Sequence, residues 1–172
     1  KKNIKCTRIL LKNKFTPIQK EIVEKGVCLK VCNQRLSKNS TLSGIKHLNR
    51  LENVLAKTEL EPENFDGILL DSHGYVNECI SSTIIMRIGN TLFIPSQDGA
   101  GVSGVTKKII IENAGYLGYK IKIKKILLEE LIKSDEVVIT NSLIGVIPIR
   151  KINNKKWKSF KLSYDINKIF EF

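Results

Sequence analysis

The stretch ILLDSHGYVNECISSTIIMRIGNTLFI, residues 68–94, decides the fold of this chain. The turns Ser72-His73-Gly74 and Gly89-Asn90 divide it into apolar runs. These runs lie at 68–71, 75–80, 83–88 and 91–94. Short apolar runs joined by polar turns that contain glycine are typical of β-hairpins. Two consecutive hairpins exclude a purely parallel sheet, so we predict an α+β or mixed α/β fold.

Helical and strand patterns extend on both sides of the hairpins. Upstream we predict a strand at 6–11, a helix from Thr16-Pro17 to Gly26, a strand at 27–32, a loop at 33–44 and a helix at 45–57. Downstream we predict a glycine-rich loop at 95–103, a helix at 104–118, a strand at 119–126, a short helix at 127–133, strands at 136–140 and 146–152, and a final helix near 164–171. Strands interspersed with helices favour a sheet with flanking helices over an all-β or all-helical domain.

Length and composition favour a soluble globular domain. The 172 residues are 42% hydrophobic and 27% charged, which is neither a disordered nor a fibrous composition. No apolar run approaches the ~18 residues of a membrane span, and the first residues do not resemble a signal peptide. We therefore expect a cytoplasmic protein that is not bound to a membrane. The four cysteines and two histidines match no zinc-ligand spacing, so we expect no metal site.

The net charge of +12 raises the question of nucleic-acid binding. The lysines are spread along the chain and do not form one stripe. The densest group, KIKIKK at 120–125, alternates like a strand with one solvated lysine face. Nucleic-acid binding is therefore not the favoured function.

Lys46 is a candidate for covalent chemistry because it lies at the start of the predicted helix at 45–57. An amine partly removed from water there can lose its proton and form an imine. Arg50, four residues on, would share that helical face and could receive an anionic group. The alternatives are a solvated lysine and a surface arginine paired with Glu52 or Glu59.

Three further features could serve a ligand. Glu78 alternates with apolar neighbours and would need a cationic or hydrogen-bonding partner if buried, although a solvated edge glutamate fits as well. The segment GVSGVT at 101–106 precedes a helix, where free backbone amides and the Thr106 hydroxyl could bind a phosphate, or it is an ordinary helix start. Thr140-Asn141-Ser142 is either a polar cluster facing a ligand or a turn.

Taken in order, four segments resemble the aminodeoxychorismate lyases. They are GIKHLNRLENVLA (44–56), ILLDSHGYVNE (68–78), GVSGVTKKI (101–109) and SDEVVITNSLIGVIPI (134–149). These lyases belong to the pyridoxal-phosphate family that also contains the branched-chain and D-amino-acid aminotransferases. The resemblance extends to about residue 152. It implies that residues 1–172 form one pyridoxal-phosphate-binding large domain, with a mixed or barrel-like sheet, from which the small N-terminal domain of the family is absent.

The resemblance also assigns roles to residues. Lys46 would form the imine with pyridoxal 5'-phosphate, and Glu78 would bind the ring nitrogen; their separation, 78 − 46 = 32 residues, fits the lyase and D-amino-acid branches. Val105, Thr106 and Ser142 would contact the cofactor phosphate, and Arg50 would receive a substrate carboxylate.

The implied reaction converts 4-amino-4-deoxychorismate to 4-aminobenzoate and pyruvate for folate synthesis, in a homodimer. Without the small domain, which supplies an arginine to the phosphate in this family, the chain itself is expected to bind cofactor weakly. The alternatives are an aminotransferase of the same family and a non-catalytic remnant or basic binding protein.

Overall fold

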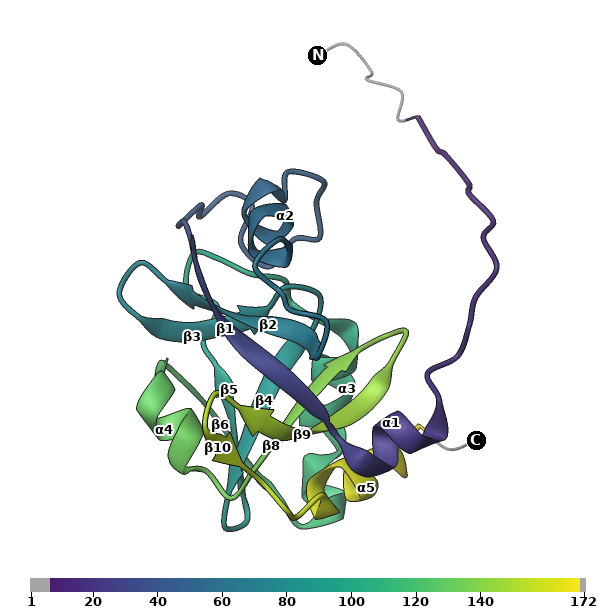
Figure 1. Cartoon of the computed structure of the whole chain (residues 1–172), viewed down its shortest axis with the longest axis vertical. Helices are drawn as coiled ribbons and strands as arrows, with labels where there is room; N and C mark the ends of the chain where they lie inside the picture. Colours follow the sequence, from purple (N-terminus) through teal and green to yellow (C-terminus); the bar gives the residue numbers. More distant parts are fainter. Residues whose placement is uncertain (1–6, 171–172) are drawn as a thin grey trace.

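The computed structural model describes residues 7–170, which form one large sheet with helices around it (Figure 1). The helices are α1 (Lys20–Lys25), α2 (Leu51–Lys57), α3 (Val105–Asn113), the 3-10 helix η1 (Ala114–Leu117), α4 (Leu128–Lys133) and α5 (Lys161–Asn167). The strands are β1 (Val27–Leu36), β2 (Asn64–Asp71), β3 (Tyr75–Cys79), β4 (Thr83–Ile88), β5 (Thr91–Pro95), β6 (Lys120–Lys124), β7 (Ile126–Leu127), β8 (Glu136–Asn141), β9 (Gly145–Ile152) and β10 (Lys155–Lys156).

The sheet is mixed, as the two hairpins predicted. Its strand order is β6-β5-β4-β8-β9-β1-β2-β3-β7, with β10 paired to β9. The pairs β2–β3 and β4–β5 are antiparallel hairpins, which confirms both predictions from the 68–94 stretch. The pairs β5–β6, β9–β1 and β1–β2 are parallel. The strands curve into a nearly closed, barrel-like arrangement, and α2 lies at the opposite end of the view from α4 and α5 (Figure 1).

Apolar side chains pack on both faces of the central strands. The first four residues of β4 and the first five of β8 are buried, because one face of these strands points into the barrel and the other packs beneath α3 and α5. Ile84, Met86 and Ile139 belong to the inner cluster, whereas Ile85 and Val138 belong to the outer one. Strands buried on both faces have near-continuous apolar sequences, as TIIMRI does. These rigid central strands carry several residues of the site described below.

Downstream of the hairpins the element predictions are confirmed with small shifts. The helix predicted at 104–118 is α3 followed by η1, and it ends at Gly118 in the left-handed conformation. The strand predicted at 119–126 appears as β6 and β7, and the short helix at 127–133 as α4. The final helix, predicted near 164–171, is α5, which begins three residues earlier and ends at Asn167. Residue 171 lies outside the described residues.

Upstream of the hairpins three predictions are wrong. Residues 7–11 of the predicted strand at 6–11 have no regular structure, because no neighbouring strand pairs with them, and Leu10 is 98% exposed. Residue 6 lies outside the described residues. The helix predicted from Thr16-Pro17 is limited to α1. The helix predicted at 45–57 begins only at Leu51, so Lys46 does not lie on a helix. Within residues 7–170, no helix is long and apolar enough to cross a membrane.

Candidate active site

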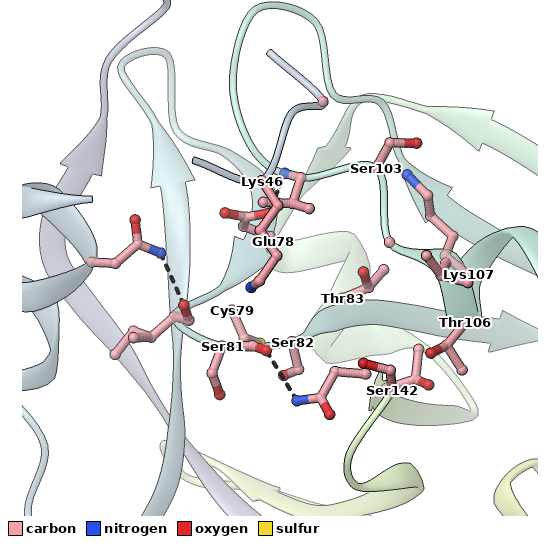
Figure 2. Close-up of a pocket in the computed structure, with 18 of the residues that line it drawn as sticks. Lys46, Glu78, Cys79, Ser81, Ser82, Thr83, Ser103, Thr106, Lys107 and Ser142 are labelled. Atoms are coloured by element: carbon pink, nitrogen blue, oxygen red, sulfur yellow. Dashed lines mark hydrogen bonds between the residues drawn. The ribbon is translucent and has the colours of Figure 1, made fainter. Parts of the chain in front are cut away.

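A pocket of about 310 Å³ opens at the ends of β3 and β8 and at the beginning of β4, next to the start of α3 (Figure 2). All six residues singled out from the sequence line this pocket: Lys46, Arg50, Glu78, Val105, Thr106 and Ser142. They come from segments up to 96 positions apart (142 − 46 = 96), so the fold and not local sequence brings them together. In Figure 2, Lys46 and Glu78 lie on one side of the pocket, and Thr106 and Ser142 lie together on the opposite side.

Lys46 lies on an irregular segment that a second loop holds in place. The N–H of Gly44 donates to Gly101 O at 2.9 Å, and the N–H of Ser103 donates to Gly44 O at 2.9 Å. This parallel pairing of Gly44 with Val102 holds the chain just before Lys46, where the predicted helix would begin, in a non-helical conformation. Lys46 is exposed to solvent, and its side chain is directed into the pocket beside Glu78 (Figure 2). An accessible amine next to a buried carboxylate is therefore a feature of this pocket.

Glu78 is buried, with 5% of its surface exposed, so the solvated alternative is wrong. Its Oε2 accepts a hydrogen bond from the Val102 N–H at 2.7 Å, and its Oε1 lies 3.4 Å from Nη1 of Arg50. Burial raises the pKa of Glu78, while the Val102 N–H, Arg50 and Lys107 oppose that rise. A carboxylate in this position is only partly compensated by the protein, so a cationic or N–H group of a ligand would be favoured beside it.

Arg50 differs from its prediction in its contacts. It precedes α2 and does not share a helical face with Lys46, because residues 45–50 are not helical. Its guanidinium contacts Glu78 and, at 3.4 Å, the carbonyl oxygen of Ile45. Arg50 thus links the segment that bears Lys46 to the strand that bears Glu78.

The opposite side of the pocket is the N-terminus of α3. Lys108 N–H donates to Gly104 O, which is the first bond of the helix, so the N–H groups of the three preceding residues have no acceptor within it. A Cβ at Gly104 would lie 2.9 Å from Oγ1 of Thr83, so only glycine lets this helix start approach β4 so closely. Thr106 is buried and Ser142 is exposed on the turn after β8. Free amides and hydroxyl groups here suit a phosphate.

Several residues that line the pocket were not predicted from the sequence. Lys107 follows Thr106 in the first turn of α3, and burial lowers its pKa, whereas Glu78 opposes that change. Ser81 and Ser82 both donate their hydroxyl groups to buried Asp66, at 2.9 and 2.7 Å. No short motif marks these residues. The only feature of the sequence that points to Lys107 is its position at a helix start, next to the residues expected to bind a phosphate.

The charges of the pocket favour an anionic ligand. Lys46, Arg50 and Lys107 line it together with one carboxylate, Glu78. The N-terminus of α3 adds partial positive charge. Among residues 7–170 no group of three His, Cys, Asp or Glu side chains could hold a metal ion.

The chain is similar to one family of known proteins. The family described as amino-transferase class IV matches residues 5–152. The chain is 35% identical to an aminodeoxychorismate lyase of Vibrio harveyi over 76% of its length, and 33% identical to one of Bacillus subtilis over 92%. It is also 31% identical, over 81% of its length, to a probable branched-chain-amino-acid aminotransferase of Thermotoga maritima. These alignments cover 48%, 52% and 51% of the relatives, so the chain spans about half their length.

Solved structures agree with the fold. The 4-amino-4-deoxychorismate lyase of Pseudomonas aeruginosa superposes with a TM-score of 0.83 and 33% identity, covering 88% of this chain and 57% of that one. The branched-chain amino acid aminotransferase of Escherichia coli has a TM-score of 0.78 at 22% identity, over 85% of this chain and 52% of that one. The second likeness shows the fold alone.

Proposed function

The chain belongs to the class IV aminotransferase family, and from this we propose that it forms the cofactor-binding part of a pyridoxal 5'-phosphate-dependent lyase acting on 4-amino-4-deoxychorismate. One observation carries the proposal: the pocket offers an accessible lysine and a buried carboxylate on one side, and a helix N-terminus on the other. These are the groups that an aldehyde-bearing pyridine with a phosphate arm requires.

The residues present fit the cofactor. Lys46 would hold the aldehyde carbon, Glu78 the ring nitrogen, and the amides of Val105 and Thr106 with the hydroxyl groups of Thr106 and Ser142 the phosphate. The glycine at 104 keeps space open at the phosphate end, where a Cβ would meet Thr83. When bound, pyridoxal 5'-phosphate supplies an electron-withdrawing ring that stabilises negative charge developing on the substrate.

Glu78 and Lys46 would divide the proton chemistry. The carboxylate of Glu78, supported by Arg50 at 3.4 Å, would favour a proton on the ring nitrogen of a bound cofactor. The amine of Lys46, once displaced from the cofactor by the substrate amine, would accept a proton at one substrate atom and return it at another. Across the whole reaction the C–O bond to the enolpyruvyl group breaks, pyruvate leaves, and the ring becomes aromatic as 4-aminobenzoate.

Covalent trapping tests the cofactor assignment. The 172-residue chain is mixed with pyridoxal 5'-phosphate, reduced with borohydride and digested, and the modified lysine is mapped by mass spectrometry. We expect the label on Lys46 and its loss in Lys46→Ala, with Lys57→Ala as the matched control because Lys57 is an exposed lysine outside the pocket. A label spread over many surface lysines would overturn the assignment.

A second comparison tests the phosphate end. Thr106→Val removes one hydroxyl and keeps the shape, so affinity for pyridoxal 5'-phosphate should fall about 10- to 150-fold, the value of one hydrogen bond to a charged group. Affinity for pyridoxal, which lacks the phosphate, should not change. An equal loss for both compounds would place the phosphate elsewhere.

Product analysis separates the lyase from the aminotransferases that are also similar to this chain. The loaded protein is incubated with 4-amino-4-deoxychorismate, and separately with D-alanine or L-leucine. Equal amounts of 4-aminobenzoate and pyruvate support the lyase. Formation of a keto acid from either amino acid, with no 4-aminobenzoate, supports an aminotransferase.

A further inference from the structure

The side chain of Gln97, in the loop after β5, connects three segments around the pocket. Its Oε1 accepts a hydrogen bond from Nζ of Lys107, and its Nε2 donates to the carbonyl oxygen of Val102, each at 2.5 Å. Its backbone oxygen accepts the hydroxyl of Ser43 at 2.9 Å. Gln97 does not itself line the pocket, so it acts on the site through these three neighbours.

Two of these neighbours control the Lys46 and Glu78 side of the pocket. Val102 is bound on its carbonyl side by Gln97 and on its N–H side by Glu78, at 2.7 Å. Ser43 immediately precedes Gly44, and Gly44 pairs with Val102. Gly44 lies two residues before Lys46 in the sequence. Gln97 thus holds the Val102 backbone, which contacts the Glu78 side chain and pairs with the segment that bears Lys46.

The third neighbour, Lys107, is a potential competitor for Glu78. Lys107 lines the same pocket, is half-buried, and attracts Glu78 electrostatically, since each changes the other's pKa. A half-buried ammonium needs a hydrogen-bond acceptor. Figure 2 shows the Lys107 side chain directed toward the loop that carries Ser103. The acceptor that it uses there is the neutral amide oxygen of Gln97.

Resting on the proposed function, we infer that Gln97 is a positioning residue that holds the Lys107 ammonium on its amide oxygen and so keeps the Glu78 carboxylate free for the ring nitrogen of the cofactor. Without Gln97, Lys107 loses this acceptor, and Glu78 is the carboxylate that lines the same pocket and attracts it. The ion pair that then forms would occupy the carboxylate that the ring nitrogen needs.

A double-mutant cycle distinguishes this role from a purely structural one. Dissociation constants for pyridoxal 5'-phosphate are measured by absorbance for the unmodified chain, Gln97→Leu, Lys107→Met and the double variant, with Lys108→Met as the control on the exposed side of α3. We expect Gln97→Leu to weaken binding about tenfold, a coupling of usual size for contacting residues. In the Lys107→Met background the same substitution should change binding by less than about twofold.

The conservative variant sharpens the test. Gln97→Glu keeps an acceptor for Lys107 but loses the donor to Val102, so it should bind the cofactor within about threefold of the unmodified chain. Loss of affinity equal to that of Gln97→Leu would show that the bond to Val102, and not the restraint of Lys107, is what matters, and would overturn the inference.

A measurement without cofactor separates this inference from the proposed function. The acetylation rate of Lys107 by acetic anhydride, read by mass spectrometry, reports how strongly its proton is held. We expect Gln97→Leu to slow acetylation several-fold because the new pair with Glu78 keeps the amine protonated. Adding Glu78→Gln should restore the rate.

The outcomes are distinct. If Gln97→Leu weakens cofactor binding equally with and without Lys107, and acetylation does not change, the inference is wrong while cofactor binding stands. If the unmodified chain takes up no cofactor but acetylation responds as expected, the proposed function fails, and Gln97 still restrains Lys107.

Discussion

Two of the walls that line the pocket differ in how they are held. The sheet wall consists of Glu78, Cys79, Thr83 and Thr140, all on strands and all at most 8% exposed. The loop wall consists of Gly44, Lys46, Arg50 and Ser103, which lie outside helices and strands. Backbone hydrogen bonds between neighbouring strands and the packing of the inner apolar cluster stabilise the sheet wall. The loop wall depends on the pairing of Gly44 with Val102 and on a few side-chain bonds.

This difference matches two requirements of the proposed covalent cofactor site. A carboxylate that must remain buried beside a ring nitrogen benefits from a rigid support, which the sheet supplies. A lysine that must both attach to a cofactor and move protons needs room to reorient, which an exposed segment allows. Segments with few buried contacts also open at lower free-energy cost than central strands.

Breaking the support of the sheet wall should have the largest effect on stability. Ile139 precedes Thr140 on β8 and is fully buried in the inner cluster. Ile139→Ala should lower the free energy of unfolding by about 2–5 kcal/mol, the range for emptied core positions. Ile123→Ala on β6, where the side chain is 58% exposed, is the control and should change it by less than about 0.5 kcal/mol. Urea unfolding measures both, and equal losses would contradict the difference in packing.

An effect of similar size is expected where the two walls meet, at Gly101. Its φ is +85°, and a Cβ there would lie 2.5 Å from Asn77 Oδ1 and 2.9 Å from Glu78 Oε2. Gly101→Ala should destabilise the chain by about 1–2 kcal/mol from the left-handed backbone and by about 1–3 kcal/mol more from overpacking. It should also weaken cofactor binding.

Gly99→Ala is the matched control for that substitution. Gly99 has nearly the same φ, +87°, but a Cβ there meets only the flexible side chain of Lys38, at 3.3 Å or more. It should show the backbone cost alone and retain cofactor binding. A loss of binding in Gly99→Ala equal to that in Gly101→Ala would mean that loop strain, and not contact with Glu78, disturbs the site.

The sheet wall could be predicted from sequence, and the loop wall could not. Hairpins follow from apolar runs and turn residues, both of which are local signals. The helix predicted at 45–57 rested on the helical spacing of five apolar residues, of which Leu51, Val54 and Leu55 lie in α2. Ile45 and Leu48 lie before α2 and are 54% and 102% exposed, so burial does not support a helix there. The contact that overrides the local pattern is the pairing of Gly44 with Val102, 58 residues away (102 − 44 = 58).

The same reasoning explains what was found and missed in the site. Spacing along the chain could not show that Lys46, Glu78 and Thr106 share one pocket; their resemblance to a family suggested it. Gln97 has no motif around it, because its importance depends on contacts with residues 43, 102 and 107. Nonlocal contacts of this kind become visible only in three dimensions.

A smaller effect, visible as a pH dependence, should distinguish Glu78 from the exposed glutamates. Burial raises the pKa of Glu78 in the folded chain above its ordinary value of 4.5. A raised pKa favours the protonated form, so the stability contributed by Glu78 is fully present below about pH 4.5 and is lost as pH rises through the raised pKa. The stability of Glu78→Gln relative to the unmodified chain should therefore increase across that window.

Urea unfolding at a series of pH values measures this dependence, and Glu129→Gln, on the outer side of α4, is the control. Saturation with pyridoxal 5'-phosphate should remove the dependence in the unmodified chain, because a cationic ring nitrogen would stabilise the charged carboxylate. Without cofactor, the free energies of unfolding of Glu78→Gln and of the unmodified chain are compared at each pH. If their difference does not change with pH, Arg50 and the Val102 N–H already compensate the charge of Glu78.

The smallest effect is expected at the outer surface of the loop wall. Leu48 lies between the pocket residues His47 and Arg50, yet it is 102% exposed. Leu48→Ala should change the free energy of unfolding by less than about 0.5 kcal/mol and leave cofactor affinity within about twofold. A Leu→Ala substitution costs stability only where the leucine is buried, so the change in the free energy of unfolding reports whether this part of the loop wall is covered. A loss above about 1.5 kcal/mol would mean that Leu48 is covered in solution, and the loop wall would then be held as firmly as the sheet wall.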